Sequence, residues 1–301
     1  MSLRYKTVGI TARSDIVDTD GVVADIASIV QSTGARVLLD GSRCKKNPKK
    51  THIFSCHKEL DLLIVVGGDG TILRAVREMG VSECMNVPIL SVNTGTMGFL
   101  AELSLQESAA MIPVLLSGKG TIEQRSMLHV TARRKQKMLW SGFVLNEAVI
   151  SQGAISRLID LKTTVDGDPL ATFHADGVIL STPTGSTAYS LAAGGPIVHP
   201  QLQATILTPI NPHSFSQKPI VLPKNDVIEI TIVTKPNKFR DIQISLTLDG
   251  QQYVTLQRDD IVRAEATNET VKFLRRKEET FFSTLRSKLK WGERPEAADR
   301  D

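Results

Sequence analysis

The sequence predicts two domains, an α/β N-terminal domain built on a parallel sheet and an all-β C-terminal domain. Over residues 1–120, strand-like and helix-like segments alternate, which is typical of parallel strands joined by helical crossovers. After residue 121, period-two apolar patterns separated by turn signals replace the helical spacing. Helical spacing returns only near the end of the chain, at residues 277–290.

In the first domain, a helix is expected at residues 21–33, where five aliphatic side chains share one face. The four strands are expected at residues 6–10, 35–39, 62–66 and 89–92.

In the second domain, alternating apolar residues indicate a layered β-sandwich. Asp166-Gly167 and Asp249-Gly250 are typical turn pairs between its strands. The helix at the end of the chain is expected to pack back on the first domain, which gives domains of residues 1–120 with 271–301, and 121–270. The strands are expected at residues 128–134, 143–150, 155–165, 226–233, 242–248 and 261–266.

Composition excludes several classes of protein. The chain has 301 residues with a net charge of +4, which is too small to argue for a nucleic-acid partner. No apolar run approaches the roughly 20 residues of a membrane span, and the N-terminus lacks the layout of a signal peptide. Three cysteines without a C-x-x-C pair favour a reducing cytoplasm. The basic segment 43–58 is interpreted as a solvated loop, with a cationic flap over polyphosphate as the alternative.

Two glycine-bearing loops follow predicted parallel strands, where such sheets bind ligands. Gly67-Gly68-Asp69-Gly70 follows the third strand, and NTGTMG at residues 93–98 follows the fourth. Neither loop has the G-x-G-x-x-G pattern, and no Lys-Ser/Thr pair follows, so the dinucleotide fingerprint and the P-loop are both excluded. A carboxylate among glycines is unexpected at a phosphate site, because it should repel the phosphate.

Two further segments carry polar groups suited to a small ligand. Residues 176–196, DGVILSTPTGSTAYSLAAGGP, are dense in hydroxyls and glycine, and the plainer interpretation is a turn capping a helix at residues 187–193. Asn146-Glu147 interrupts an apolar run, and both side chains need partners if they are buried. An amide and a carboxylate can bind an adenine edge or a ribose diol, whereas a polar sheet edge would need neither.

Together these segments resemble the NAD kinase family. The resemblance rests on GGDGT at residues 67–71, NTGTMGFL at 93–100, NE at 146–147 and the long motif at 176–196, with PHSFSQKP at 212–219 and LDGQ at 248–251. It implies a Rossmann-like first domain, a β-rich second domain, and ATP-dependent phosphorylation of the 2′-hydroxyl of the adenosine ribose of NAD to give NADP. It also implies a divalent cation such as Mg²⁺, with ligands that the sequence does not identify, and a homodimer or homotetramer.

The resemblance assigns residues by position. Asp69 matches the catalytic carboxylate, and Gly70 and Arg74 follow it at the nucleotide site. Asn146, Glu147 and Asp176 match the contacts to NAD. Whether NADH is also accepted stays open, because residue type varies in the family at His174. The remaining matched positions are Arg157, His174, Thr187, Ala188, Tyr189, Ser190, Leu191, Ala192 and Gln251.

In this interpretation, Asp69 points at the ribose hydroxyl and accepts its proton during attack, which is worth roughly 10²–10⁴-fold in rate. Three alternatives compete with this interpretation: a lipid kinase with the same GGDGT loop, an inactive NAD(P)-binding regulator, and a nucleic-acid binder using residues 43–58. The first leaves the 176–196 motif unexplained, the second leaves Asp69 unexplained, and the third lacks an aromatic platform.

Overall fold

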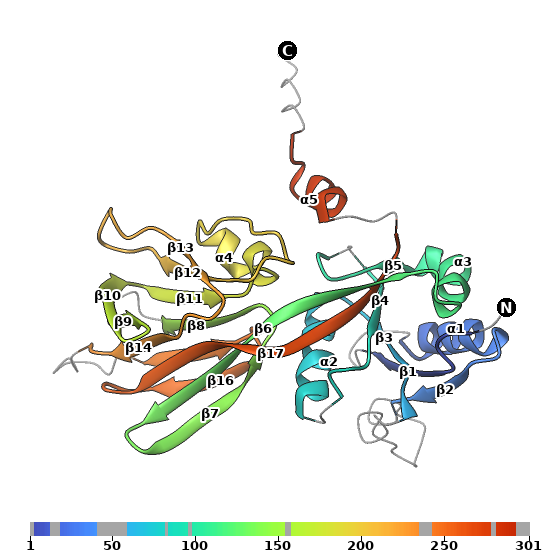
Figure 1. Ribbon diagram of the computed structural model, residues 1–301, viewed down its shortest axis with the longest axis horizontal. Coiled ribbons are helices and arrows are strands. Elements are labelled where there is room, and N and C mark those ends of the chain that lie inside the picture. The colour runs from blue at the N-terminus through green and yellow to red at the C-terminus, as the bar shows by residue number, and fades with distance from the viewer. Residues whose placement is uncertain are drawn as a thin grey trace. The chain divides into compact units, whose positions relative to one another are not determined.

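The computed structural model describes residues 3–12, 19–40, 59–81, 84–95, 98–153, 158–234, 243–277 and 281–292. The chain forms two compact units (Figure 1). Unit 1 comprises Met1–Ile72, Val87–Glu123 and Phe273–Asp301, and unit 2 comprises Leu73–Asn86 and Gln124–Lys272. Residues 73–86, which the sequence-based division counted with the first domain, thus cluster with unit 2. The basic segment 43–58 lies outside the described residues.

Unit 1 contains the predicted parallel sheet, in the order β4-β3-β1-β2, with β5 beside β4. All five residues of β3 are buried, which explains its continuous apolar sequence. Helices α1 and α3 pack against one face, where Val30 and Ile112 meet Ile64 in one core. The strands are β1 (Thr7–Ala12), β2 (Arg36–Leu39), β3 (Leu62–Val66), β4 (Ile89–Asn93) and β5 (Leu103–Ser104), and the helices are α1 (Thr19–Ser32) and α3 (Leu105–Leu116).

Helix α3 had no counterpart in the sequence analysis. Ser104 caps it, since its hydroxyl accepts from the Glu107 amide while the Glu107 carboxylate accepts from the Ser104 amide. Helix α2 (Asp69–Val81) begins at Asp69, directly after the glycine pair. Helix α5 (Phe281–Leu289) is shorter than predicted, and its residues belong to unit 1.

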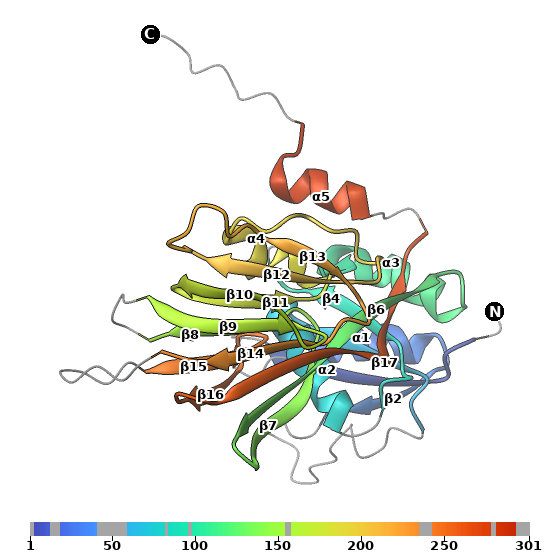
Figure 2. The same ribbon diagram turned by 60° about the vertical axis from the view of Figure 1, so that its left-hand side comes forward.

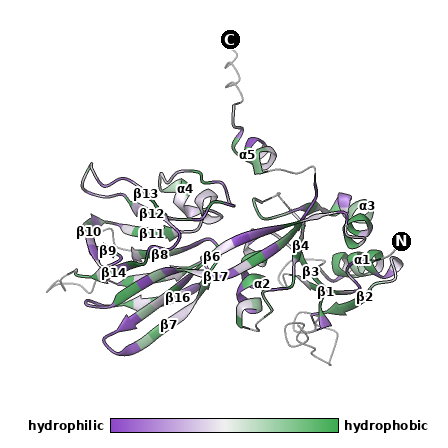
Figure 3. Cartoon of the chain, viewed as in Figure 1, coloured by the Kyte–Doolittle hydropathy of each residue, from purple (hydrophilic) through white to green (hydrophobic). Residues whose placement is uncertain are grey.

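Unit 2 is built from two sheets that enclose one core, which confirms the predicted sandwich. Phe173 and Ile230 from the first sheet pack with Leu246 from the second. Strands of both sheets alternate in burial, as along β14 and β15, and Figure 3 shows the matching alternation in hydropathy.

The strands of the two sheets of unit 2 can be followed in Figure 2. The first contains β10 (Asp168–Ala175), β9 (Ile159–Val165), β14 (Ile228–Ile232), β17 (Ile261–Arg275), β6 (Thr121–Arg134) and β7 (Lys137–Val144). The second contains β13 (Ile220–Pro223), β12 (Ala204–Ile210), β11 (Gly177–Ser181), β8 (Glu147–Gln152), β15 (Ile244–Leu248) and β16 (Gln252–Leu256). The last residues of β17 belong to unit 1, where Phe273 pairs with Ile89 of β4.

Both Asp-Gly turns are confirmed. Asp166 and Gly167 have φ of 49° and 86°, and Asp249 and Gly250 have φ of 47° and 65°. Positive φ at both positions suits the twist of a hairpin and favours Asp followed by Gly.

Three sequence-based assignments are wrong. The strand expected at residues 143–150 is divided, because β7 ends at Val144 and β8 begins at Glu147. The helix expected at residues 187–193 is a 3₁₀ turn, η2 (Gly185–Thr187), followed by the one-turn helix α4 (Tyr189–Ala192). Residues 201–218, where no strand was expected, contain β12, which pairs with β11 and β13.

The sandwich core makes a first prediction. Phe173 is 2% exposed and Phe215 is 90% exposed. Phe173→Ala should lower the free energy of unfolding by about 3–5 kcal/mol, since it leaves a cavity between the sheets. Phe215→Ala, the matched control, should change it by about 0.5 kcal/mol or less. Urea denaturation measures both, and similar losses in the two variants would contradict the assigned core.

Candidate functional site

The Asp69 carboxylate joins the two glycine-bearing loops of unit 1. Its Oδ2 accepts from the Phe99 amide at 2.9 Å, and its Oδ1 accepts from the Leu100 amide at 3.3 Å. A Cβ atom on Gly98 would collide with this carboxylate, so glycine is required there. The two loops are therefore neighbours, and the two residues directly after the second loop supply amides to Asp69. We define Asp69, Gly98, Phe99 and Leu100 as the Asp69 cluster.

Electrostatics in the Asp69 cluster favour a basic carboxylate. Burial raises the pKa of Asp69 above its usual value, while the amides of Phe99 and Leu100, and then the charges of Lys288 and Arg275, oppose that rise. A carboxylate with a raised pKa holds a proton more readily, which suits proton transfer at neutral pH.

In unit 2, Asp249 organises the break between β7 and β8. Its Oδ2 accepts from the Leu145 amide at 2.9 Å, and its Oδ1 accepts from the amides of Asn146 and Glu147 at 2.8 and 3.0 Å. These three amides lie where the two strands end, so the carboxylate replaces ladder partners. We define Leu145, Asn146, Glu147 and Asp249 as the Asp249 cluster.

Glu147 lies in this cluster with its side chain buried. Among the residues that the structure describes, none donates a hydrogen bond to its buried Oε2. Burial and the charge of Asp249 raise the pKa of Glu147 to about 8, although the Tyr189 amide stabilises the charged form. Burial also raises the pKa of Asp249 to about 6, against the three amides it accepts and the charge of Arg77. A ligand hydroxyl that donated to Glu147 would satisfy its unpaired oxygen.

The 182–190 segment packs tightly beside Asn146. The Thr182 amide donates to the Asn146 carbonyl at 2.9 Å, and the Thr182 hydroxyl donates to the Leu145 carbonyl at 2.5 Å. A Cβ atom on Gly185 would collide with the backbone of Asn146, so this glycine permits the close approach.

Most hydroxyls of this segment serve the fold, contrary to the expectation that they are available for a ligand. The Ser186 hydroxyl donates to the Pro183 carbonyl, and that of Thr187 to the Thr184 carbonyl. Ser190 is fully buried, and its hydroxyl bonds to that of Thr208 at 2.9 Å. Tyr189 and Ala192 are exposed, while Ala188 and Leu191 are half-buried.

The remaining candidates have varied surroundings. Asp176 accepts from the side chains of Gln152 and Asn211, at 3.3 and 3.0 Å. His174 Nδ1 lies 2.7 Å from Asp160 Oδ1, with the ring half exposed.

Three further candidates were assigned by position. Gly70 is exposed and Arg74 half-buried on α2. Arg157 lies outside the described residues.

Sequence reasoning missed two residues of unit 2. Asp249 holds the Asn146-Glu147 pair, and Arg77 donates to Gln251 Oε1 at 2.9 Å. Asp249 belongs to the LDGQ motif, which was a usable signal, whereas Arg77 carried none.

Comparison with known proteins decides the family. The model of the ATP-NAD kinase N-terminal domain matches residues 20–119, and that of the ATP-NAD kinase C-terminal domain matches residues 145–276. The chain belongs to the NAD kinase family. It is therefore a kinase that phosphorylates NAD. Because the match extends over both domains, it also decides against a lipid kinase that shares only the GGDGT loop.

Relatives and solved structures agree with this assignment. An NAD kinase of Geobacter metallireducens is 42% identical over 234 residues, which cover 78% of this chain and 80% of that protein. One of Acidobacterium capsulatum is 41% identical over 91% of this chain and 89% of its own length. The structure of yeast NADH kinase complexed with NADH has a TM-score of 0.83, at 26% identity over 98% of this chain and 90% of that one. An NAD kinase from Archaeoglobus fulgidus in complex with ATP has a TM-score of 0.71, at 25% identity over 94% and 98%.

The raised pKa of Glu147 makes a second prediction. A carboxyl whose pKa is higher in the folded state stabilises the fold below the unfolded pKa, and that contribution is lost as the pH rises through the folded value of about 8. Without nucleotides, Glu147→Gln should therefore gain stability relative to the unsubstituted protein between pH 5 and 8, by about 2–4 kcal/mol.

Chemical denaturation at a series of pH values measures this difference. The exposed Glu269→Gln is the control, and its profile should run parallel to that of the unsubstituted protein because its side chain lies in water. A parallel profile for Glu147→Gln would contradict the raised pKa assigned to this buried carboxyl.

Proposed function

We propose that the chain transfers the terminal phosphoryl group of ATP to the 2′-hydroxyl of the adenosine ribose of NAD, giving NADP. The observation that carries this is the buried Glu147 carboxyl, because a ribose hydroxyl would supply the hydrogen bond that its Oε2 lacks among the described residues. The NADH complex of the yeast enzyme and the ATP complex of the archaeal enzyme support these two substrates.

On the dinucleotide side, we propose that Asn146, Glu147 and Asp176 bind NAD. Asn146 is half-buried with its backbone fixed by Asp249 and Thr182, which leaves its side chain for a ligand to engage. We propose lesser contacts from His174, Arg157, Gln251 and the segment Thr187, Ala188, Tyr189, Ser190, Leu191 and Ala192. Ser190 would act through its backbone, since its hydroxyl is buried against Thr208.

On the phosphate side, we propose that Asp69 is the general base. Each of its oxygens accepts one amide and keeps a lone pair that a substrate hydroxyl can use. Gly70 lies in the first turn of α2, where amides and the helix dipole favour phosphate, and we propose that Arg74 adds a positive charge.

We propose a divalent cation such as Mg²⁺ in the reaction. Among the described residues, no three His, Cys, Asp or Glu side chains converge as ligands. The residues present therefore fit an ion held mainly by polyphosphate oxygens and water, as Mg²⁺ prefers. When bound, such an ion neutralises phosphate charge, which would offset repulsion from Asp69.

Three further properties expected from the sequence are proposed for this chain: its location, its oligomeric state with its partners, and its domain bounds. These are a cytoplasmic location, a homodimer or homotetramer without nucleic-acid partners, and domains at residues 1–120 with 271–301 and at 121–270. No helix among the described residues is long and apolar enough to cross a membrane.

The purified chain should convert NAD and ATP to NADP in the presence of Mg²⁺ and leave diacylglycerol unmodified. Mass spectrometry and ³¹P NMR identify the position of the new phosphate. A phosphate on any other hydroxyl, or no product across several divalent ions, would overturn the proposal.

Asp69→Asn should lower kcat by roughly 10²-fold or more, because an amide cannot take the hydroxyl proton. KM values should change by less than about threefold, since the overall shape is kept. The amide nitrogen cannot accept the second backbone N–H, so the variant should also lose about 1 kcal/mol of stability.

The matched control is Asp61→Asn, because the Asp61 carboxylate likewise accepts two backbone amides of unit 1, from Lys6 and Thr7. This control should keep its turnover. The base assignment would be refuted if Asp69→Asn kept a near-normal kcat, or if it lost NAD binding and not kcat.

A further inference from the structure

Both backbone polar groups of Leu100 in unit 1 are hydrogen-bonded. Its amide donates to Asp69 Oδ1 at 3.3 Å. Its carbonyl accepts from Arg275 Nη1 at 3.2 Å and from the buried Ser91 hydroxyl at 2.9 Å. The amide and the carbonyl belong to two successive peptide planes that meet at the Leu100 Cα atom. A carbonyl held by two donors therefore restrains the backbone that also carries the amide bound to the Asp69 carboxylate.

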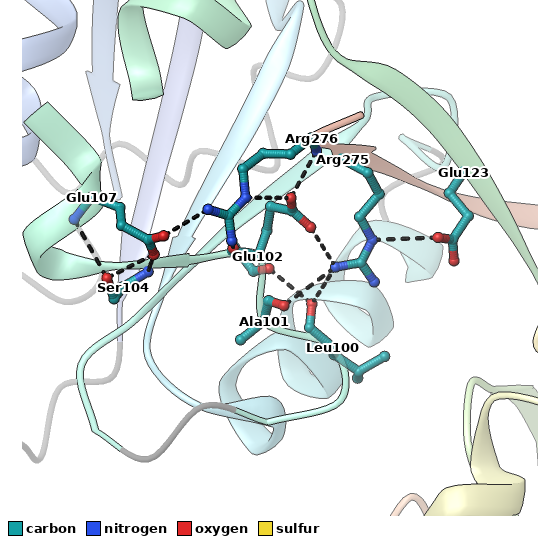
Figure 4. A network of polar contacts seen from close by, with 9 residues as sticks. Leu100, Ala101, Glu102, Ser104, Glu107, Glu123, Arg275 and Arg276 are labelled. Atoms are coloured by element: carbon teal, nitrogen blue, oxygen red, sulfur yellow. Dashed lines mark hydrogen bonds and ion pairs between the residues drawn. The ribbon is translucent and has the colours of Figure 1, made fainter. Parts of the chain in front are cut away.

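Arg275 is fixed in turn by two carboxylates, of which that of Glu102 is buried (Figure 4). Its Nη1 also donates to Glu102 Oε2 at 3.0 Å, and its Nε lies 3.6 Å from Glu123 Oε2. The side chains of Arg275 and Glu102 are only 10% and 3% exposed. Glu102 also accepts from the Arg276 amide at 2.7 Å, so the end of β17 and the segment after Leu100 are locked together.

We propose that Arg275 is a positioning residue for phosphoryl transfer, which restrains the backbone at Leu100 and through it the orientation of the Asp69 carboxylate. This inference rests on the proposed role of Asp69 as general base. Arg275 lies at the end of β17, outside every motif by which the family was recognised.

The positive charge of Arg275 also acts on the Asp69 carboxylate. The charges that lower the pKa of Asp69 come from Lys288 and Arg275, after the larger effects of burial, which raises it, and of the two amides. Loss of the Arg275 charge should therefore raise the pKa of Asp69 further. The deprotonated, active base would then form only at higher pH.

The test is the pH profile of kcat for Arg275→Gln and Arg275→Lys. Arg275→Gln should lower kcat by about 10-fold or more, keep KM for NAD and ATP within about twofold, and move the acid limb of the profile to higher pH. Arg275→Lys keeps the charge, so it should restore the acid limb and part of kcat. A wild-type kcat and acid limb in Arg275→Gln would overturn the proposal.

The matched control is Glu107→Gln, which breaks the pair between Arg276 and Glu107 at 2.6 Å in the same network without touching Leu100 or Asp69. Glutamine keeps the capping box of α3, so this variant should lose stability but retain kcat and its pH profile. A shift of its acid limb equal to that of Arg275→Gln would show a general structural effect and overturn the specific role.

If Arg275→Gln does not fold, Ser91→Ala carries the test, because it removes the other donor to the Leu100 carbonyl without leaving a buried charge. It should lower kcat by about threefold at unchanged KM. An unchanged kcat in Ser91→Ala would count against positioning of Asp69 through the Leu100 backbone.

The Asp69→Asn background separates this proposal from the one it rests on. Arg275→Gln should add little to the loss already caused by Asp69→Asn, because it acts through Asp69. A multiplicative further loss would place its effect elsewhere and overturn the positioning role. If Asp69→Asn itself keeps its turnover, the base assignment fails. If only Arg275→Gln keeps its turnover, positioning alone fails.

Discussion

Hydrogen bonds from backbone N–H groups to carboxylates fix Asp69 in unit 1 and the Asn146-Glu147 pair in unit 2. A buried amide without an acceptor costs about as much as a lost hydrogen bond, and amides at strand ends have no ladder partner. Asp249 accepts three such amides in unit 2, and Asp69 accepts two in unit 1. Glu102 accepts the Arg276 amide in the same manner. Asn146 and Glu147, which the family resemblance assigned to NAD, therefore lie on a segment fixed by a side chain 103 and 102 positions away in sequence.

In the Asp249 cluster, the burial that prepares a carboxyl for a ligand also lowers the stability of the fold. Burial in the Asp249 cluster raises the pKa of Glu147 to about 8 and that of Asp249 to about 6. Two neighbouring carboxyls in such surroundings favour at least one proton, so the fold carries a cost that a bound diol could relieve. Raised pKa values of this kind concentrate at functional sites, which agrees with the position of Glu147 in the family motif.

The sequence was sufficient where local pattern decides structure. The apolar run at residues 62–66 became β3 without a change of bounds, and the Asp-Gly pairs became turns. The sequence was insufficient to predict structure that depends on hydrogen-bond partners far away along the chain. The apolar run at residues 143–150 gave no sign of a break at Leu145-Asn146, because the break depends on Asp249, 104 and 103 positions away. The hydroxyls of Thr182, Ser186 and Ser190 indicated a ligand surface, yet their bonds to the surrounding backbone and side chains are set by packing that no local pattern records.

The carboxylate among the glycines has a physical explanation that combines both loops. Gly67 has a φ of 144°, and a Cβ atom at this position would collide with the Thr71 side chain. The turn into α2 therefore requires glycine at residue 67. Gly98 is required for another reason, since the Asp69 carboxylate occupies the space of its missing side chain. That position brings the carboxylate to the amides of Phe99 and Leu100. A longer glutamate would need more space than the absence of one Cβ provides, and a side chain on Gly98 would displace even aspartate. The second glycine loop thus serves the acid of the first, and the amides that its sequence offered to a phosphate are in part already used by the protein's own carboxylate.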